Sequence, residues 1–444
     1  MAVYAKLFTG KRAQVHAARD LQGVRLLETA GISTPACLYA GSFEDGQVLV
    51  FEAIENSENT EAVWSRLKSS EERKALATLL VTEVGRHHRA GLIQQDLYLK
   101  NFLLSDDQLL TLDGDGIKVV SAGSANAEYM QNLATLLSKF DLLELRVWLP
   151  DLMLAYAKAY SAGQSLAQSG WTESHVFALA KRMRQDMIRA YAEKKVMRNC
   201  TDVTITKSLH QWSARANQAT WLRAQPTLQS PSALDSMLDE NPSRLKSGNT
   251  CTVASVQLAE RRVVIKRYNI KSFWHGLSRG WRPSRAVISW QNAHRLQLAG
   301  FATAAPLQVL ERRWGWWRRQ AYFLMEHLAG VDIADYFRDV QYSQQARRQM
   351  AEQLATLMYG LYQLGIAHGD CKSSNFVVFA DRIHLIDLDA MRQTRFEWCA
   401  AKAHVRDLKR MLRNWEGDQE TSSMIKEAFG RVYGTSAVYL EAIR

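Results

Sequence analysis

The chain has 444 residues, too many for one ordinary hydrophobic core, and this length suits two domains of about 200 residues each. Hydrophobic residues make up 47% of the sequence and charged residues 23%, which excludes a disordered or fibrous chain. The net charge of +11 favours an anionic partner, whether nucleotide phosphate, nucleic acid or an acidic membrane surface, and does not choose among them.

The cysteines and the apolar segments indicate the compartment. The five cysteines are odd in number and form no CxxC pair, so we expect neither a disulfide framework nor a zinc site, and a reducing compartment fits. Residues 1–10 lack a charged stretch followed by a long apolar run, so we expect no signal peptide. Residues 140–160 are apolar but carry five charged side chains and Pro150, which predicts a buried or amphipathic helix. We therefore expect a cytoplasmic protein, with peripheral attachment to a membrane face left open.

Strands, helices and one linker are predicted along the chain. The segments VLVF (48–51) and VVIKRY (263–268) are short, apolar and rich in β-branched residues, which predicts strands. Residues 71–90 and 343–364 have the periodicity of amphipathic helices, and each is followed by a glycine, Gly91 or Gly365. Residues 222–246 contain three prolines among Ser, Asp and Asn residues, and we predict a linker there.

The two halves contain a repeat. The segment GLIQQDLYLKNFLL from Gly91 matches GIAHGDCKSSNFVVF from Gly365, and LLTLDGDG matches IHLIDLDA further on. In both copies an Asp precedes an Asn by five positions, and a second Asp follows that Asn by twelve. The matched residues are Asp96, Asn101 and Asp113 in the first copy and Asp370, Asn375 and Asp387 in the second. Upstream, VLVFEAIE with Glu52 matches YFLMEHLA with Glu326, so the repeat covers most of both halves.

The repeated residues suit phosphoryl transfer. This reaction needs metal ions and a cation on the phosphates, and a carboxylate that orients the attacking hydroxyl. In the pattern Asp-x-x-x-x-Asn, the Asp would face the hydroxyl, and the Asn and the second Asp would bind magnesium through oxygen atoms. The cation would be Lys266 in VVIK, whose first-half equivalent is Lys6 in VYAK. An isolated Asp-x-x-x-x-Asn more often caps a helix, and it is the duplication that favours the kinase interpretation.

This set of residues resembles the protein-kinase superfamily signature of a strand lysine, a loop Asp with its Asn, and a later Asp. The loop His368-Gly369-Asp370 is similar to the variant found in aminoglycoside- and choline-kinase-like enzymes. The second half more closely resembles the lipopolysaccharide core kinases of Gram-negative bacteria, through VVIKRYN, the pattern SRAxxxWxNAHRLxxxG (284–300), IDLDAMR, and Asp407-Leu408. The resemblance spans about residues 246–415 and, in weaker form, 3–137.

The resemblance implies an α+β fold with two tandem protein-kinase-like bilobal domains, at 1–221 and 247–444, joined by the linker 222–246. It implies that the C-terminal domain uses ATP and Mg²⁺ to phosphorylate a heptose or Kdo sugar hydroxyl of the lipopolysaccharide inner core. In that picture Asp370 orients the hydroxyl, Asn375 and Asp387 hold magnesium, and Lys266 binds the α/β phosphates. Glu326, with Glu52 as its equivalent, lies on the segment that links the lobes and holds adenine through backbone groups. In the first copy the equivalent residues are Asn101 and Asp113 for magnesium, Lys6 for the phosphates and Asp96 for the hydroxyl.

Two departures from the family pattern stand out. The glutamate that pairs with the strand lysine is replaced by Ser289 in the second copy and by Asp20 in the first. The first copy has Gln94-Gln95-Asp96 in place of the His-Gly-Asp loop, and only five residues precede Lys6, whereas the second copy has a hairpin with a single Gly248. We therefore expect the first copy to be structural or regulatory, and His368 to be a structural residue that bonds to the backbone.

A basic, tryptophan-rich segment lies within residues 266–319. It would be either buried tryptophans beside solvated arginines, or a surface for phosphorylated lipid headgroups or saccharide at the inner membrane. Its residues are Trp274, Trp281, Trp290, Trp314, Trp316, Trp317, Arg279, Arg282, Arg285, Arg312, Arg313, Arg318 and Arg319.

Three other functions stay open. One is a kinase for another small hydroxylated molecule, and the second is a non-catalytic scaffold of two pseudokinase domains in lipopolysaccharide assembly. The third is a basic nucleic-acid-binding protein, although no recognised nucleic-acid module occurs and we do not expect nucleic acid as a partner.

Overall fold

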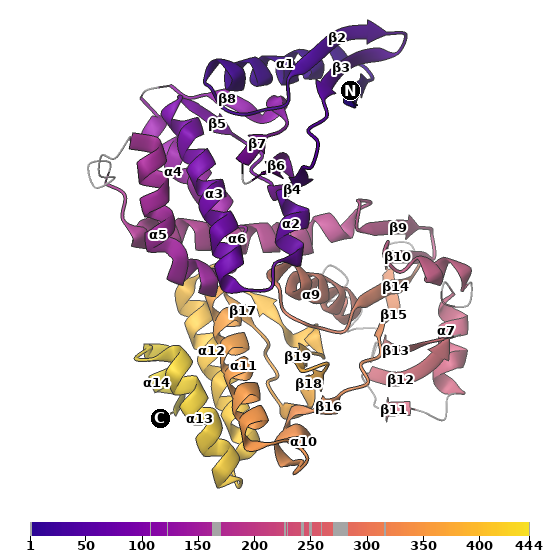
Figure 1. Cartoon of the computed structure of the whole chain (residues 1–444). Helices are drawn as coiled ribbons and strands as arrows, with labels where there is room; N and C mark the ends of the chain where they lie inside the picture. The colour runs from indigo at the N-terminus through magenta and orange to yellow at the C-terminus, as the bar shows by residue number, and fades with distance from the viewer. Residues whose placement is uncertain are drawn as a thin grey trace. The chain divides into compact units, whose positions relative to one another are not determined.

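The structure is a computed structural model that describes residues 2–106, 108–121, 123–161, 170–225, 228, 230–240, 244–247, 251–258, 260–269, 283–314 and 317–443. The chain forms two compact units, Met1–Arg184 (unit 1) and Gln185–Arg444 (unit 2), and helix α6 (Glu173–Glu193) contains the division. Both units combine helices with antiparallel sheets (Figure 1), as an α+β chain requires.

Unit 1 begins with a three-stranded antiparallel sheet in the order β1-β3-β2, formed by β1 (Val3–Thr9), β2 (Cys37–Phe43) and β3 (Gly46–Glu52). Helix α1 (Ala13–Thr29) connects β1 to β2 and packs against β1 and β3. Its buried residues Ala13, Ala17, Val24 and Leu27 recur at helical spacing, so one face of α1 is apolar.

The rest of unit 1 is mainly helical. It contains β4 (Glu58–Asn59), α2 (Thr60–Arg66), α3 (Ser70–Arg89), β5 (Leu92–Gln94), β6 (Phe102–Ser105), β7 (Gln108–Thr111), β8 (Ile117–Val119), α4 (Ala125–Leu137) and α5 (Leu142–Ser161). A capping box of Ser69 and Glu72 starts α3, and Gly91 with φ of 76° follows its end, so the predicted helix 71–90 is confirmed. The short ladders β4-β6-β7 and β5-β8 frame the loop that carries Asp96 and Asn101.

Unit 2 contains a seven-stranded sheet in the order β11-β12-β13-β15-β14-β10-β9. The strands are β9 (Val203–Lys207), β10 (Gln211–Ala216), β11 (Arg244–Ser247), β12 (Cys251–Leu258), β13 (Arg261–Tyr268), β14 (Pro306–Trp314) and β15 (Trp317–Glu326). Helix α9 (Arg285–Ala299) packs against β13, β14 and β15. The predicted strand 263–268 is confirmed as the buried part of β13.

The helical part of unit 2 follows the same order of elements as unit 1. It contains β16 (Val331–Asp332), α10 (Ile333–Arg338), α11 (Gln344–Gln363), β17 (Ile366–Ala367), β18 (Phe376–Phe379), β19 (Arg382–Leu385), β20 (Arg392–Gln393), α12 (Glu397–Leu412), α13 (Gln419–Tyr433) and α14 (Ala437–Ile443). The ladders β16-β18-β19 and β17-β20 correspond in order to β4-β6-β7 and β5-β8, and β13-β15-β14 corresponds to β1-β3-β2. The predicted helix 343–364 is confirmed as α11.

The predicted linker contains regular structure. Helix α7 (Pro231–Asp239) starts with a proline in its first turn, where the missing N–H costs nothing, and buries Leu234 and Leu238. Proline and serine in this segment therefore mark a helix start. Strands β9 and β10 also belong to the sheet of unit 2, because Trp212 of β10 pairs with Glu311 of β14, so unit 2 starts before the predicted boundary at residue 221.

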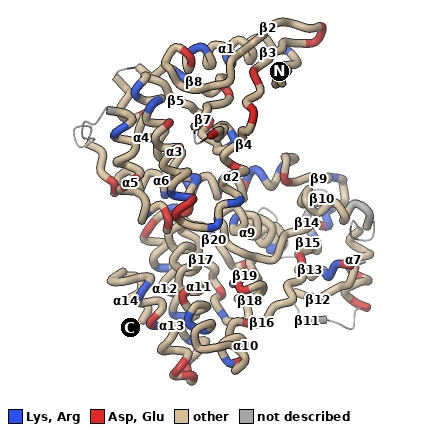
Figure 2. The backbone as a smooth tube through the Cα atoms, in the orientation of Figure 1, with Lys and Arg blue, Asp and Glu red and all other residues tan. Residues whose placement is uncertain are grey.

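Charged residues are spread over both units. Figure 2 shows Lys and Arg interspersed with Asp and Glu along the backbone. The apolar segment around Pro150 forms α5, and no helix within the described ranges is long and apolar enough to cross a membrane.

Candidate active site

A partly buried ion pair joins the sheet and the helical part of unit 2. The ammonium Nζ of Lys266 on β13 lies 2.6 Å from Oδ1 of Asp387, and the Lys266 side chain is 10% exposed. A lysine in the middle of a buried strand needs an anion because an unpaired charge there would be strongly destabilising. Asp387 supplies that anion.

Asp387 occupies a sharp turn after β19. Its backbone is left-handed, with φ of 60°, which an Asp tolerates better than most residues. The preceding N–H of Ile386 donates to the carbonyl of Asn375 at 3.0 Å, so the turn is tied to the loop before β18. Asn292 of α9 donates to the carbonyls of Leu388 and Met391, both at 2.8 Å, and thereby fixes the other side of the turn.

Asp370 and Asn375 form the second part of the site. The amide Nδ2 of Asn375 donates to the carbonyl of Asp370 at 2.8 Å and to its carboxylate Oδ2 at 3.2 Å. Lys372 lies 3.4 Å from the same Oδ2, and the Asp370 side chain is 38% exposed. Asp370 therefore presents a carboxylate of fixed position to solvent, as a residue that orients an incoming hydroxyl must.

Two buried residues hold this loop. Asp407 of α12 accepts hydrogen bonds from the backbone N–H groups of His368 (2.7 Å) and Gly369 (3.0 Å). Burial raises the pKa of Asp407, and the two N–H donors act against that rise. His368 is fully buried, and its Nε2 bonds to the carbonyl of Ile386 at 3.1 Å. Burial lowers the pKa of His368, so the ring is neutral and structural, as expected from the sequence.

A cavity of about 490 Å³ lies between these two parts. Its polar lining includes the side chains of Lys266, Lys372, Asn375 and Asp387. Its apolar lining consists of Val253, Val264, Ala304, Met325, Leu328, Val377 and Ile386. Such a cleft fits a ligand with a flat apolar ring and a charged tail.

The charges of the cleft are balanced in pairs. Burial alone would raise the pKa of Asp387, but Lys266, with help from Lys372 and Arg285, lowers it instead, so this carboxylate is ionised. Asp389 lies two residues further and pairs with Arg285 at 2.6 Å. Burial and the charge of Asp387 raise the pKa of Asp389, and Arg285 counteracts them.

The donor set fits a magnesium ion that is shared with phosphates. No cluster of three or more His, Cys, Asp and Glu side chains suited to a metal occurs in the described parts of the chain. Magnesium, however, is usually held by one or two carboxylates together with substrate phosphates and water rather than by a full protein cage. Asp387 and Asn375 line the same cavity and offer one carboxylate and one amide oxygen, which suits that mode of binding.

The helix residue next to the lysine differs between the units. Ser289 of α9 does not contact Lys266 through any hydrogen bond in the described structure, because its hydroxyl bonds to that of Tyr268 at 3.0 Å. In unit 1, by contrast, Asp20 of α1 lies 2.5 Å from the ammonium of Lys6, and Asp113 lies 2.6 Å from the same ammonium. Asn101 donates to the carbonyl of Asp96 at 2.8 Å, the distance found for Asn375 and Asp370.

The remaining predicted positions lie around these sites. Glu326 ends β15 and lines the cleft of unit 2, and Glu52 ends β3 in unit 1 and is exposed. Gly248 lies outside the described residues. The sequence interpretation missed Lys372, Asp389 and Arg285 as charges of the cleft. The first two stand two positions after Asp370 and Asp387, so their spacing was the available signal.

The basic, tryptophan-rich segment is described only in part. Trp290 is fully buried and donates to the carbonyl of Val196 at 3.2 Å, whereas Arg312 and Arg319 are exposed. Trp274, Trp281, Trp316, Arg279 and Arg282 lie outside the described residues.

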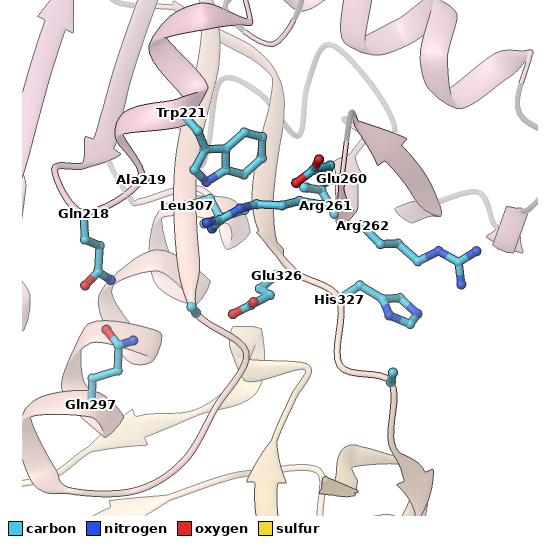
Figure 3. Close-up of a pocket in the computed structure, with 13 residues that line it drawn as sticks. Gln218, Ala219, Trp221, Glu260, Arg261, Arg262, Gln297, Leu307, Glu326 and His327 are labelled. Atoms are coloured by element: carbon cyan, nitrogen blue, oxygen red, sulfur yellow. The ribbon is translucent and has the colours of Figure 1, made fainter. Parts of the chain in front are cut away.

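A second cavity of about 670 Å³ borders the segment that follows β15 (Figure 3). It shares Glu326 and His327 with the cleft, and Arg261 lies over the Trp221 ring at 5.5 Å from its centroid. Neither Lys266 nor Asp387 lines it, so this ion pair belongs to the smaller cleft alone.

The comparison with known families concerns unit 2. Residues 237–433 match the model of the lipopolysaccharide kinase (Kdo/WaaP) family. The matched range contains Lys266, Asp370, Asn375 and Asp387, and it excludes unit 1. No curated protein matches the chain significantly.

Proposed function

We propose that this protein is an ATP-dependent kinase whose C-terminal domain phosphorylates a sugar hydroxyl, of heptose or Kdo, in the lipopolysaccharide inner core. The observation that carries the proposal is the Lys266–Asp387 pair at 2.6 Å in the cleft, beside Asn375, which also lines the cleft and bonds to Asp370. The match of residues 237–433 to a lipopolysaccharide kinase family supports the sugar acceptor. We also propose that unit 1 is a second kinase-like domain, on the basis of its matching order of elements.

The cleft suggests how ATP is held. The N–H groups of Glu326 and His327 already bond to the carbonyls of Ala305 and Arg262. The backbone of Leu328, the next cleft residue, is therefore our candidate for the adenine edge. The apolar side chains on the two sides of the cleft would enclose the ring, and Lys266 would contact the α/β phosphates. A magnesium ion held by Asp387 and Asn375 would neutralise charge on the transferred phosphate.

The chemical step follows from the position of Asp370. Its carboxylate would accept a hydrogen bond from the sugar hydroxyl and aim the oxygen at the γ-phosphorus. The bond from that oxygen to phosphorus forms as the bond to the β–γ bridging oxygen breaks, and ADP leaves with the electron pair. The proton of the hydroxyl passes to Asp370 or to the phosphoryl oxygens. Lys372, 3.4 Å from Asp370, would stabilise the negative charge nearby.

The acceptor places the reaction at a membrane surface. Lipopolysaccharide core is attached to lipid, so the protein would act from the cytoplasmic side of the inner membrane as a peripheral protein. The net charge of +11 would favour an anionic lipid surface.

The experiment is transfer from γ-labelled ATP to purified lipopolysaccharide core in magnesium buffer. We would compare the native protein with Asp370→Asn and with the matched variant Asp96→Asn of unit 1. Loss of transfer with Asp370→Asn alone would support the proposal. Absence of transfer by the native protein, both to the core and to a panel of other sugars, would contradict it and favour a pseudokinase scaffold.

A further inference from the structure

Helix α12 of unit 2 has two faces of different character. Its buried face packs against α11, α14 and β17 (Figure 1) and contains Asp407, which holds the loop of Asp370. The opposite face is exposed and starts with two large aromatic side chains. Phe396, just before the helix, is 65% exposed, and Trp398, in its first turn, is 70% exposed.

This exposure is unfavourable for the protein alone. Aromatic side chains are stabilised by removal from water, and the fully buried Trp290 shows that unit 2 can enclose a tryptophan. A single exposed apolar side chain needs no explanation, whereas exposed apolar side chains that occur together mark interaction sites. Phe396 and Trp398 occur together at the start of one helix, so we looked for a partner surface there.

A row of basic side chains continues this face along α12. Lys402, Arg406 and Lys409 follow Trp398 by four, eight and eleven positions, which places all four residues within one arc of about 80° on the helix. The three basic side chains are exposed, and they have no ion-pair or hydrogen-bond partner among the described residues. We call these four residues, together with Phe396, the α12 surface.

The charge around the α12 surface is strongly positive. Residues 392–413 contain seven Lys and Arg residues and only two acidic residues, Glu397 and Asp407. Asp407 is buried and accepts hydrogen bonds from the loop, so its carboxylate faces away from the exposed side of the helix. The exposed side therefore complements an anionic partner.

The combination of aromatic and basic side chains favours a membrane over an acidic protein. Trp and Phe insert where headgroups meet acyl chains, while Lys and Arg contact the headgroup phosphates. Lys409, near the end of α12, would also favour the helix dipole, but Lys402 and Arg406 lie in the middle of the helix, where the dipole gives no such benefit.

We propose that the α12 surface docks the protein on a bilayer that contains anionic phospholipid. The proposal deepens the proposed function, on which it rests for the lipid-linked acceptor, because it names the face that meets the membrane. The loop of Asp370 is bonded to the buried side of the same helix, so docking would hold this loop one helix diameter, about 10 Å, from the headgroups. The sequence had suggested residues 266–319 for a lipid surface, and α12 lies outside them.

The test measures binding of the full chain to vesicles in the absence of ATP and sugar. Sedimentation would compare vesicles of phosphatidylcholine alone with vesicles of phosphatidylcholine and phosphatidylglycerol. We expect binding to the anionic vesicles only, and weaker binding at higher salt, because salt screens exposed charges. The triple variant Lys402→Gln/Arg406→Gln/Lys409→Gln should bind about a hundredfold more weakly, since each basic residue near an anionic surface contributes about fivefold.

A matched variant separates the α12 surface from net charge. Lys207→Gln/Arg348→Gln/Arg382→Gln removes the same charge from exposed residues of β9, α11 and β19. It should bind within a few-fold of the native protein, and thermal unfolding checks that both triple variants fold. An equal loss of binding in the two triple variants would overturn the α12 surface, as would unchanged binding of the α12 variant.

A fluorescence measurement tests the aromatic part. Bromine-labelled phosphatidylcholine in the anionic vesicles quenches a tryptophan that enters the bilayer. The native protein should therefore lose more fluorescence than the Trp398→Phe variant, which keeps an apolar ring and should still bind. Equal quenching of the two proteins would show that Trp398 stays outside the bilayer and would contradict the proposed docking.

The outcomes separate this proposal from the kinase function. A native protein that binds the anionic vesicles through α12 but transfers no phosphate to the core would contradict the proposed function alone. A native protein that transfers phosphate but does not bind the anionic vesicles would overturn the docking surface alone, and would leave an acidic protein as the partner that the charges fit.

Discussion

Lys266 and Asp387 are 121 positions apart in the sequence, yet their charged atoms lie 2.6 Å apart in the cleft of unit 2. Both residues line that cleft, and the ammonium of Lys266 lowers the pKa of the Asp387 carboxyl. The pair is also the arrangement that a magnesium–phosphate ligand would rearrange, because the metal competes with Lys266 for Asp387.

Replacement of Lys266 by Met should lower kcat for sugar phosphorylation by about 10²–10³-fold, since it removes a positive charge aimed at the phosphates. Steady-state kinetics at varied ATP and magnesium measures this. Arg262→Met is the matched control on the same strand, because Arg262 is exposed and lies outside the cleft with Lys266. An equal fall in kcat in the two variants would show that kcat depends on the overall positive charge of the strand rather than on the ion pair.

Ser289→Ala should cost about 1–3 kcal/mol in the free energy of unfolding, because it leaves the hydroxyl of Tyr268, which is 5% exposed, without its partner. Urea unfolding measures this cost. The double variant Ser289→Ala with Tyr268→Phe should recover most of it, because no unpaired hydroxyl then remains. Phosphorylation should be unaffected by Ser289→Ala. A fall in kcat as large as that of Lys266→Met would mean that Ser289 positions the lysine.

Asp407→Asn should reduce kcat by about ten- to a hundredfold while the KM for ATP stays close to native. The amide has one acceptor oxygen for the N–H groups of His368 and Gly369, so the loop carrying Asp370 shifts, and small shifts of a catalytic group are costly. Separate measurement of kcat and KM tests this. A change confined to the KM for ATP would show instead that Asp407 affects nucleotide binding.

Buried histidines should make the fold sensitive to mild acid. Burial lowers the pKa of His404 to about 3, and its Nε2 bonds to the hydroxyl of Tyr433 at 2.8 Å. The unfolded chain takes up a proton near pH 6.5 that the folded chain takes up only near pH 3. The free energy of unfolding should therefore be highest above pH 6.5 and fall by about 1.4 kcal/mol per pH unit below it, for this residue alone.

The His404→Gln variant should have a free energy of unfolding that depends less steeply on pH between pH 6 and pH 4. Gln can bond to Tyr433 but does not titrate in this range. Urea unfolding at several pH values measures the slope. His384→Gln is the matched control, because His384 lies partly exposed on β19. An unchanged slope in His404→Gln would show that His404 is protonated in the folded chain.

Local patterns in the sequence predicted the local elements. Helices α3 and α11 lie within one or two residues of their predicted ranges, because amphipathic spacing and the glycines after them act over short distances. Contacts between distant segments were not predictable in this way. The pairing of β10 with β14 joins residues about a hundred positions apart, and the prolines that suggested a linker start α7.

The site shows the same contrast. The fixed spacing of Asp370, Asn375 and Asp387 predicted a group that is close in the structure, since Asn375 bonds to Asp370 and lines the cleft together with Asp387. The sequence did not reveal that Asp407 holds the loop through two backbone N–H groups, because such bonds depend on where α12 packs. Nor did it reveal the bond between Ser289 and Tyr268, which depends on how α9 lies on the sheet.

The hairpin of β9 and β10 determines where a fragment of this protein can be cut. A fragment of residues 237–433 would lack this hairpin. Loss of the hairpin would expose the edge of β14 to pairing with other chains. The fragment also omits Val196, whose carbonyl accepts the indole N–H of the fully buried Trp290. A fragment that starts near Gln185 would retain both, and we expect it to remain monomeric where the shorter one aggregates.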